Sequence, residues 1–359
     1  MSLLNKFNSL SKWVKLSIIS SFLQILVICS LEGVIFEFVY RYTSTIPASP
    51  SNSEGDSERK QAERNFKALP TYFSLFLFAQ FFQFILCVDA ALYQNTIQIS
   101  MLALFNFLLL FYACTQLYQT TSLKENIKMI LQQKLDELPS TATIINLEIS
   151  IIVILVLFAT SFAFVAYKLY QEYGWNLYKR IGADLQLKRM FMVYHVFVMI
   201  LKFDILFFIS FSTQYLVLVI YPDKNLSSDF IVHLTVSLAI CIVLSSLAFW
   251  SVRTESKYGI AAFAVGCIGV LGYFISKLYD IYLKENESER ARRFGSSKIT
   301  LTVFITFCIL FSILTVIGSI FCYRNFGRGL KDIINNNHHG KLLPDERANT
   351  RSNSRWSLD

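Results

Sequence analysis

The stretch from Ile149 to Tyr167 reads ISIIVILVLFATSFAFVAY and contains neither a charged residue nor a proline. An α-helix rises about 1.5 Å per residue, so about 20 apolar residues cross the hydrocarbon core of a bilayer, which is about 30 Å thick. Buried helices of soluble proteins are usually shorter and keep a polar stripe. The stretch therefore predicts a transmembrane helix.

Further stretches along the chain have a similar length and apolar character. Together with the first, they cover residues 16–38, 72–93, 97–117, 149–167, 190–220, 230–250, 259–278 and 299–323. All six prolines lie between or after these stretches, so each predicted span can keep the unbroken backbone hydrogen bonds that lipid requires. The sequence predicts an all-α protein, with a bundle of about eight transmembrane helices over residues 1–324.

The composition indicates the same class. Hydrophobic residues make up 54% of the chain and charged residues only 16%, against about 25% charge in an average soluble domain, which excludes a soluble enzyme. The seven cysteines all lie within predicted spans, where they act as small hydrophobic side chains. We expect no disulfide framework, metal site or cofactor. The lipid bilayer is the implied partner, and we expect no nucleic-acid partner.

The first predicted span follows a basic flank that contains Lys6, Lys12 and Lys15, and so resembles a secretory signal peptide. Its apolar character continues to Phe38, beyond a typical signal h-region of about 7 to 15 residues. We favour an uncleaved anchor, with cleavage near Cys29 as the alternative.

Lys and Arg in the loops indicate the orientation, because cytosolic loops of membrane proteins are enriched in these residues. With a cytosolic N-terminus, the cytosolic segments hold slightly more Lys and Arg than the lumenal ones. Both N-glycosylation sequons, at Asn225 and Asn286, then fall in lumenal loops. Asn286 is the better acceptor, because Asn225 is close to the membrane. We predict that both termini are cytosolic.

Three segments outside the spans have distinct compositions. Residues 43–68 are rich in Ser, Pro and charge and predict a flexible lumenal loop. Ser122 and Glu125 fit a capping box, and apolar residues at helical spacing follow until Pro139, which predicts a short amphipathic helix on the lumenal membrane surface. Residues 325–359 are polar and basic and predict a disordered cytosolic tail.

The spans do not match one another in polar pattern, so the sequence does not support an inverted-repeat transporter.

Ionisable side chains inside predicted spans cost about 2.5 to 3.5 kcal/mol each at the helix centre and usually face a partner or a wet cavity. The candidates for an intramembrane polar network are Glu32, Asp89, His195, Lys202 and Asp204. Lys202 lies about 18 Å into its span and needs a counter-charge, for which Glu32 or Asp89 is available across the bundle. Asp204 is about 200° from Lys202 around the helix axis and points elsewhere. The charges predict either a structural ion pair or a proton or substrate relay.

Small residues follow one another along the predicted span at 259–278. They are Gly259, Ala262, Gly266, Gly269 and Gly272. Such a seam lets two helices approach closely. Close packing inside the bundle is the first interpretation, and a homo-oligomer through this seam is the alternative.

Aromatic and basic residues alternate between the predicted fourth and fifth spans. The central ones are Tyr173, Trp175, Tyr178, Lys179 and Arg180. Amphipathic rings and cations at a cytosolic interface are typical of a membrane-anchoring belt. The alternative is a docking loop for a cytosolic partner, another membrane protein or an anionic lipid headgroup.

The same region carries a family resemblance. It contains Gln-Glu-Tyr-Gly-Trp at residues 171–175 and Arg-Ile-Gly-Ala-Asp at residues 180–184, followed by the span with Lys202 and Asp204. This run resembles the uncharacterised fungal family of multi-pass Golgi apparatus membrane proteins, and the span order and basic tail extend the resemblance over the chain. The resemblance implies a Golgi membrane in a fungal cell. It implies no catalytic residues, because the family has no established activity.

The chain contains no HExxH, G-x-S-x-G or P-loop motif, so no sequence feature indicates an enzyme. We expect a non-catalytic Golgi membrane protein that helps to sort, retain or organise other membrane proteins or lipids. The alternative is a solute or proton-coupled transporter that uses the intramembrane charges.

Overall fold

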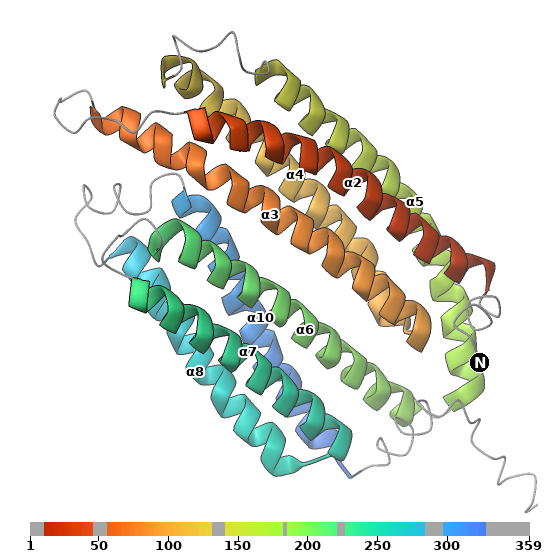
Figure 1. Cartoon of the computed structure of the whole chain (residues 1–359). Coiled ribbons are helices and arrows are strands. Elements are labelled where there is room, and N and C mark those ends of the chain that lie inside the picture. Colours follow the sequence, from red (N-terminus) through yellow and green to blue (C-terminus); the bar gives the residue numbers. More distant parts are fainter. Residues whose placement is uncertain are drawn as a thin grey trace, which may run out of the picture.

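A computed structural model describes residues 11–45, 56–130, 141–181, 185–220, 227–283 and 297–327. These segments form long helices and contain no β-strand. The helices are α2 (Lys12–Thr45), α3 (Asp56–Tyr93), α4 (Thr96–Ile130), α5 (Thr141–Ile181), α6 (Leu185–Tyr215) with a π-helical end η2 (Leu216–Ile220), α7 (Ser227–Thr254), α8 (Lys257–Tyr282) and α10 (Ser297–Asn325). Figure 1 shows them side by side as one bundle. The predicted all-α bundle is confirmed.

The described helices form two groups of four. The helices α2, α3, α4 and α5 form the N-terminal half, and α6, α7, α8 and α10 form the C-terminal half (Figure 1). Within each half, successive helices pack against each other and the last helix returns to the first. The main contacts between the halves are those of α6 with α3 and α4. Because each half holds four helices, both halves begin at the same end of the bundle and are not inverted.

Seven described helices are long and apolar enough to cross a membrane. Their apolar parts are Lys12–Arg41, Ala68–Tyr93, Thr96–Thr121, Ala142–Trp175, Lys188–Leu218, Lys257–Tyr282 and Lys298–Asn325. The remaining predicted span, at residues 230–250, lies in α7, which is 28 residues long. Its described apolar part is Ala239–Thr254, because most side chains before Ala239 are not described.

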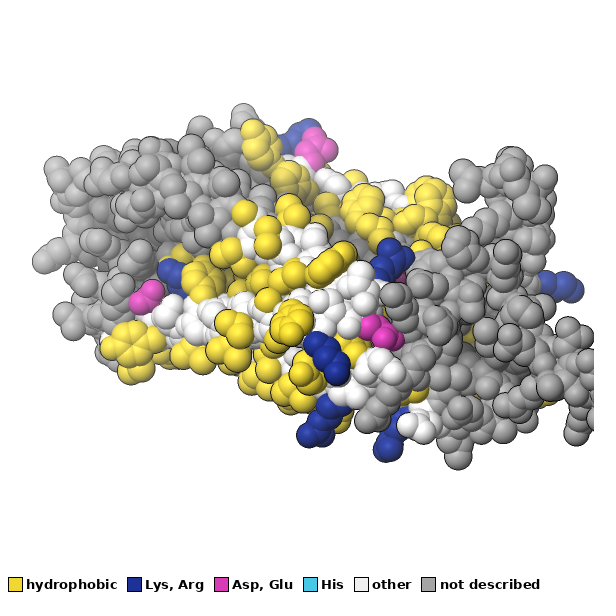
Figure 2. Space-filling view, turned by 90° about the horizontal axis from the view of Figure 1, so that it is seen from below, with side chains coloured by type: hydrophobic (Ala, Val, Ile, Leu, Met, Phe, Trp, Pro, Cys, Tyr) yellow, Lys and Arg dark blue, Asp and Glu magenta, His cyan; other side chains and the backbone are white. Residues whose placement is uncertain are grey.

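Large apolar side chains cover the outside of the bundle, as contact with lipid requires. Phe111 and Val265 are each 70% exposed, and Leu157 is 63% exposed. Figure 2 shows one face, on which hydrophobic side chains cover much of the middle and Lys and Arg side chains lie singly among them and around their margin. An apolar surface of this extent is costly in water but not against acyl chains.

The predicted lumenal loop at residues 43–68 is partly wrong. α2 continues to Thr45, and α3 begins at Asp56. Residues 56–67 are rich in Glu, Lys, Arg, Gln and Ala, which favour a helix despite their polarity. Pro70 lies inside α3 and not between spans, at the cost of one backbone hydrogen bond.

The separate amphipathic helix predicted from Ser122 is also wrong. α4 runs to Ile130 without a break, so Ser122 lies inside a helix and caps no N-terminus. Neither Gly nor Pro lies between the predicted span and Ser122, so nothing ends the helix there. Just before it, Thr121 Oγ1 donates to the Leu117 carbonyl at 2.8 Å, a bond that hydroxyls make in the middle of helices.

The predicted docking loop is helical for most of its length. α5 extends to Ile181, and α6 begins at Leu185. Lys, Leu, Gln and Glu after Tyr167 are good helix formers, and the single Gly174 costs only about 1 kcal/mol. The basic aromatic segment is therefore the end of α5.

Two tight turns join neighbouring helices at one end of the bundle. Gln94 (φ 50°) and Glu255 (φ 52°) adopt the left-handed backbone conformation, which reverses the chain within two residues. Asn95 then caps α4, because its Oδ1 accepts a hydrogen bond from the backbone N–H two residues on, at 3.1 Å. Ser256 caps α8, because its Oγ accepts a hydrogen bond from the backbone N–H of Gly259, three residues on, at 3.2 Å.

Other predictions concern residues or properties that these helices do not define. Asn225, Asn286 and the tail from residue 328 lie outside the described residues. The helices also do not define which end of the bundle faces the cytosol or whether the first span is cleaved. These stay predictions.

The small-residue seam of α8 is partly used inside the bundle. A Cβ atom at Gly266 would lie 2.5 Å from Leu244 Cδ2 of α7, and one at Gly259 would also overlap a side chain of α7. At Gly269 and Gly272 an added Cβ would meet nothing within 4 Å. Of the glycines in the seam, Gly269 and Gly272 are therefore the ones open to contact a second copy in the predicted homo-oligomer.

Close packing between α6 and α10 depends on another glycine. A Cβ atom at Gly318 would lie 2.8 Å from Phe197 Cδ2. Gly318→Val should therefore lower the free energy of unfolding by about 1 to 3 kcal/mol, because it overpacks this contact. Gly269→Val makes the same change in mid-helix at an open position and should leave the stability of the monomer nearly unchanged. Thermal unfolding in detergent compares them, and equal destabilisation would contradict the packing described here.

Candidate functional site

An ion pair inside the bundle joins the two halves. Lys202 Nζ of α6 is paired with Asp89 Oδ2 of α3. Gln98 of α4 contacts both, since its Nε2 donates to Asp89 Oδ2 at 2.6 Å and its Oε1 accepts from Lys202 Nζ at 3.4 Å. Asp89 is thus the counter-charge of Lys202, and Glu32 is not.

The pair lies closer to one end of the bundle than the position of Lys202 in its span suggested. A helical side chain points toward the N-terminus of its own helix, so the ammonium group lies nearer the start of α6 than its own Cα. Asp89 is near the end of α3, one turn from Tyr93. The side chains of Lys202 and Asp89 are 20% and 30% exposed. Both charges are satisfied here, which suits a structural role.

His195 contributes a second contact between α6 and the α3–α4 turn. Its Nδ1 accepts a hydrogen bond from Asn95 Nδ2 at 2.7 Å. The Phe191 and Tyr194 ring centroids lie 4.2 and 5.0 Å from that of His195. Because Asn95 also caps α4, this contact fixes the turn to α6. In the described segments, no three His, Cys, Asp or Glu side chains are arranged to hold a metal ion.

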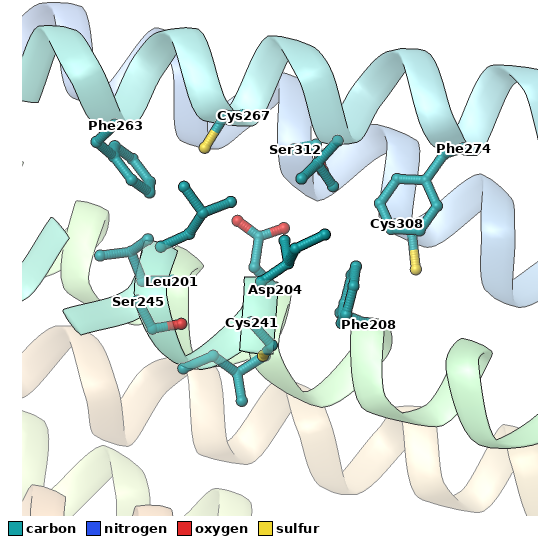
Figure 3. Close-up of a pocket in the computed structure, with 14 residues that line it drawn as sticks. Leu201, Asp204, Phe208, Cys241, Ser245, Phe263, Cys267, Phe274, Cys308 and Ser312 are labelled. Carbon is teal, nitrogen blue, oxygen red and sulfur yellow. The ribbon is translucent and has the colours of Figure 1, made fainter. Parts of the chain in front are cut away.

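Asp204 lies on a different face of α6, inside the C-terminal half. Thr315 Oγ1 of α10 donates to Asp204 Oδ2. Figure 3 shows the carboxylate directed into a small pocket of about 60 Å³. Small polar or thiol side chains from the three other helices of this half also line the pocket: Cys241 and Ser245 from α7, Cys267 from α8, and Cys308 and Ser312 from α10.

Glu32 belongs to a separate cluster in the N-terminal half. Gln116 Nε2 of α4 donates to Glu32 Oε1 at 2.9 Å. One turn further along α4, Thr120 Oγ1 donates to Glu148 Oε1 of α5 at 2.7 Å. Glu32 is 1% exposed and Glu148 is 3% exposed. The sequence analysis missed Glu148 because it directly precedes the predicted span, whereas α5 begins two turns earlier at Thr141.

Amide side chains hold the middle of the N-terminal half together. Gln24 Nε2 of α2 donates to Gln83 Oε1 of α3 and to Asn106 Oδ1 of α4, both at 3.1 Å. Gln83 Nε2 also donates to Asn106 Oδ1, at 2.9 Å. These side chains carry no charge, so the ionisable residues of the predicted spans do not point to them. Amides at the centre of three apolar spans are the signal that could have found them.

The basic aromatic segment does not form one exposed surface. Tyr173 is 1% exposed and packs in a core cluster with Val14 and Leu169, so it is not available for docking. Trp175 is 57% exposed. The side chains of Tyr178, Lys179 and Arg180 lie outside the described residues. Of the described residues in the predicted docking loop, Trp175 is exposed and can contact a partner, whereas Tyr173 cannot.

These features define a polytopic α-helical membrane protein that contains polar clusters between its helices. The chain is similar to the UPF0658 Golgi apparatus membrane protein of Schizosaccharomyces pombe. The two are 29% identical over 286 residues, and the alignment covers 74% of this chain and 78% of the S. pombe protein. The resemblance expected from the sequence is thereby confirmed. No protein-family model and no solved structure matches the chain.

The ion pair between the halves generates a stability prediction. Lys202→Met leaves Asp89 without its cation and should lower the free energy of unfolding by about 1 to 3 kcal/mol. This is less than for a fully buried pair, because both side chains are partly exposed. The double variant Asp89→Asn, Lys202→Met should be more stable than the sum of the single changes predicts, because no unpaired charge is left.

A double-mutant cycle measured by unfolding in detergent tests this coupling. Arg41→Met is the control, because its ion pair with Glu37 has side chains 61% and 57% exposed and should contribute little. Strictly additive effects of the Asp89 and Lys202 changes would show that the pair does not couple the halves.

Proposed function

We propose that the chain acts in Golgi membranes as a non-catalytic transporter, in which buried carboxylates bind the coupling proton or cation. The similarity to a Golgi apparatus membrane protein supports the location. The lack of the catalytic motifs named above supports a non-catalytic role. The distribution of Lys and Arg supports cytosolic termini.

One observation carries the transport proposal. Glu32, Glu148 and Asp204 lie inside the bundle, and each accepts its hydrogen bond from a neutral side chain. In the part of the chain that the structure describes, no Lys, Arg or His side chain pairs with any of them. A charged carboxylate in such surroundings costs several kcal/mol, whereas Gln or Asn would make a similar hydrogen bond without charge. Binding of a proton or cation gives a reason for acids at these positions, and stability does not.

The arrangement of the two halves suits alternating access. They meet around an apolar cavity of about 280 Å³ lined by α3, α4, α6 and α10. The contacts of Lys202 and His195 join the halves toward one end. Toward the other end, Gln119 Nε2 of α4 donates to Thr300 Oγ1 of α10 at 2.9 Å. Two helix groups that meet around a cavity can rock against each other, as in transporters built from two bundles.

Reconstituted protein tests the transport proposal. Proteoliposomes under an imposed pH gradient should give charge displacement when exposed to one member of a panel of amino acids, sugar phosphates, nucleotide sugars and metal ions. Asp204→Asn should abolish that current, because it removes a group that can bind a proton or cation. Glu37→Gln is the matched control, since Glu37 is an exposed carboxylate on α2. The transport proposal fails if no class of solute gives a current, or if the current survives in Asp204→Asn.

A role in sorting or retention is the second candidate. It is supported by the exposed Trp175 near the end of α5, which precedes the basic residues Lys179 and Arg180 in the sequence by four and five positions. Two turns earlier, Lys168 Nζ lies 5.8 and 5.9 Å from the ring centroids of Phe164 and Tyr167, as expected at a membrane interface.

Localisation of a variant tests this second role. The triple change Trp175→Ala, Lys179→Ala, Arg180→Ala should move a fluorescent fusion of the chain away from Golgi markers. Tyr118→Ala is the control, because Tyr118 is an aromatic residue on α4 that is 72% exposed. Unchanged Golgi localisation of a well-folded triple variant would argue against a retention signal at the end of α5.

A further inference from the structure

The acidic cluster of the N-terminal half brings two carboxylates from different helices onto one face of α4. Glu32 of α2 is bonded to Gln116, and Glu148 of α5 is bonded to Thr120, one turn away. Because Gln116 and Thr120 are neighbours on one face of α4, the two carboxylates bonded to them lie near each other. Both carboxylates are buried, and Gln116 is also buried, with only 2% of its surface exposed.

Three buried oxygen atoms in this cluster have no hydrogen-bond donor. They are Glu32 Oε2, Glu148 Oε2 and Gln116 Oε1. Gln116 Oε1 lies beside the Glu32 carboxylate, because the Nε2 of the same amide donates to Glu32 Oε1. Buried polar atoms normally have a partner, and an unpartnered one costs about 1 to 3 kcal/mol. A bound group that attracts oxygen would give these three acceptors a partner.

Charge balance narrows the identity of that group. When ionised, the two carboxylates carry two negative charges, and no cationic side chain pairs with them in the described segments. One divalent cation neutralises both. The available ligands are two carboxylates, an amide carbonyl and a hydroxyl, which are the oxygen ligands that Ca²⁺, Mg²⁺ and Mn²⁺ prefer, whereas Zn²⁺ favours nitrogen and sulfur.

We propose that Glu32, Gln116, Thr120 and Glu148 form a binding site for a hard divalent cation. The four side chains come from α2, α4 and α5, so the cation joins three helices of the N-terminal half. Thr120 is one residue before the end of the apolar part of α4, and Glu148 is six residues after the start of that of α5. The site is therefore closer to the end of the bundle where α4 leads into α5 than to the other end. This inference does not rest on the transport proposal.

Manganese binding to the purified full chain tests the site. Mn²⁺ is titrated into tag-free protein in detergent, and the free ion is measured by electron paramagnetic resonance. The wild type should bind about one Mn²⁺ per chain, and Ca²⁺ or Mg²⁺ should compete. Glu32→Gln and Glu148→Gln should each weaken binding by about 100-fold or more, since loss of a ligand exceeds the effect of losing an outer contact.

Matched controls separate this site from other acidic groups. Glu37→Gln changes an exposed carboxylate on the same helix as Glu32, and Asp204→Asn changes a buried one in the other half. Both should bind Mn²⁺ as the wild type does. Absence of Mn²⁺ binding by the folded wild type overturns the proposal and leaves protons to neutralise the pair. Binding that both Glu variants retain also overturns it, as it would then be adventitious. A solute current that persists without Mn²⁺ binding would leave the transport proposal standing alone.

Discussion

Lipid offers no hydrogen bonds to the backbone, and this constraint shapes the whole molecule. Every N–H and C=O group at membrane depth must find its partner within the protein, and a helix provides one from the same segment. Beyond that depth the helices continue for a different reason, because the residues that follow the apolar stretches favour a helix. α4 continues to Ile130 and α5 to Ile181. Sharp reversals of the chain occur at Gln94 and Glu255, where the backbone adopts the left-handed conformation. The next residue, Asn95 or Ser256, then caps the following helix.

Apolar contacts alone cannot select one arrangement of such helices, because lipid tails are as apolar as Leu. The polar side chains inside the bundle provide the selection. Gln24, Gln83 and Asn106 join three helices of the N-terminal half. Lys202, Asp89 and Gln98 join that half to α6. These contacts satisfy polar groups that lipid cannot satisfy, and each contact fixes the rotation of the helices that make it.

The acids that have no cationic partner differ from these structural contacts. Asp89 is neutralised by Lys202, but Glu32, Glu148 and Asp204 accept hydrogen bonds from neutral groups. An acid paired with a cation, such as Asp89, is explained by its contribution to stability. An acid without a cationic partner is better explained by a bound proton or metal ion. The strongest support is that Glu32 Oε2, Gln116 Oε1 and Glu148 Oε2 have no hydrogen-bond donor. Both proposals made above follow from this difference.

The sequence by itself determined that this is a polytopic membrane protein, where its spans approximately lie and which family it resembles. About 20 consecutive apolar residues in a chain of this composition form a transmembrane helix. The sequence also identified Lys202 as a residue that needs a counter-charge. Only the tertiary structure decided that the partner is Asp89 and not Glu32, that Tyr173 is buried, and that Glu148 lies inside the bundle. The physical reason is that apolar length is a local property of the chain. Which polar groups meet depends on how helices distant in sequence are rotated and placed against each other.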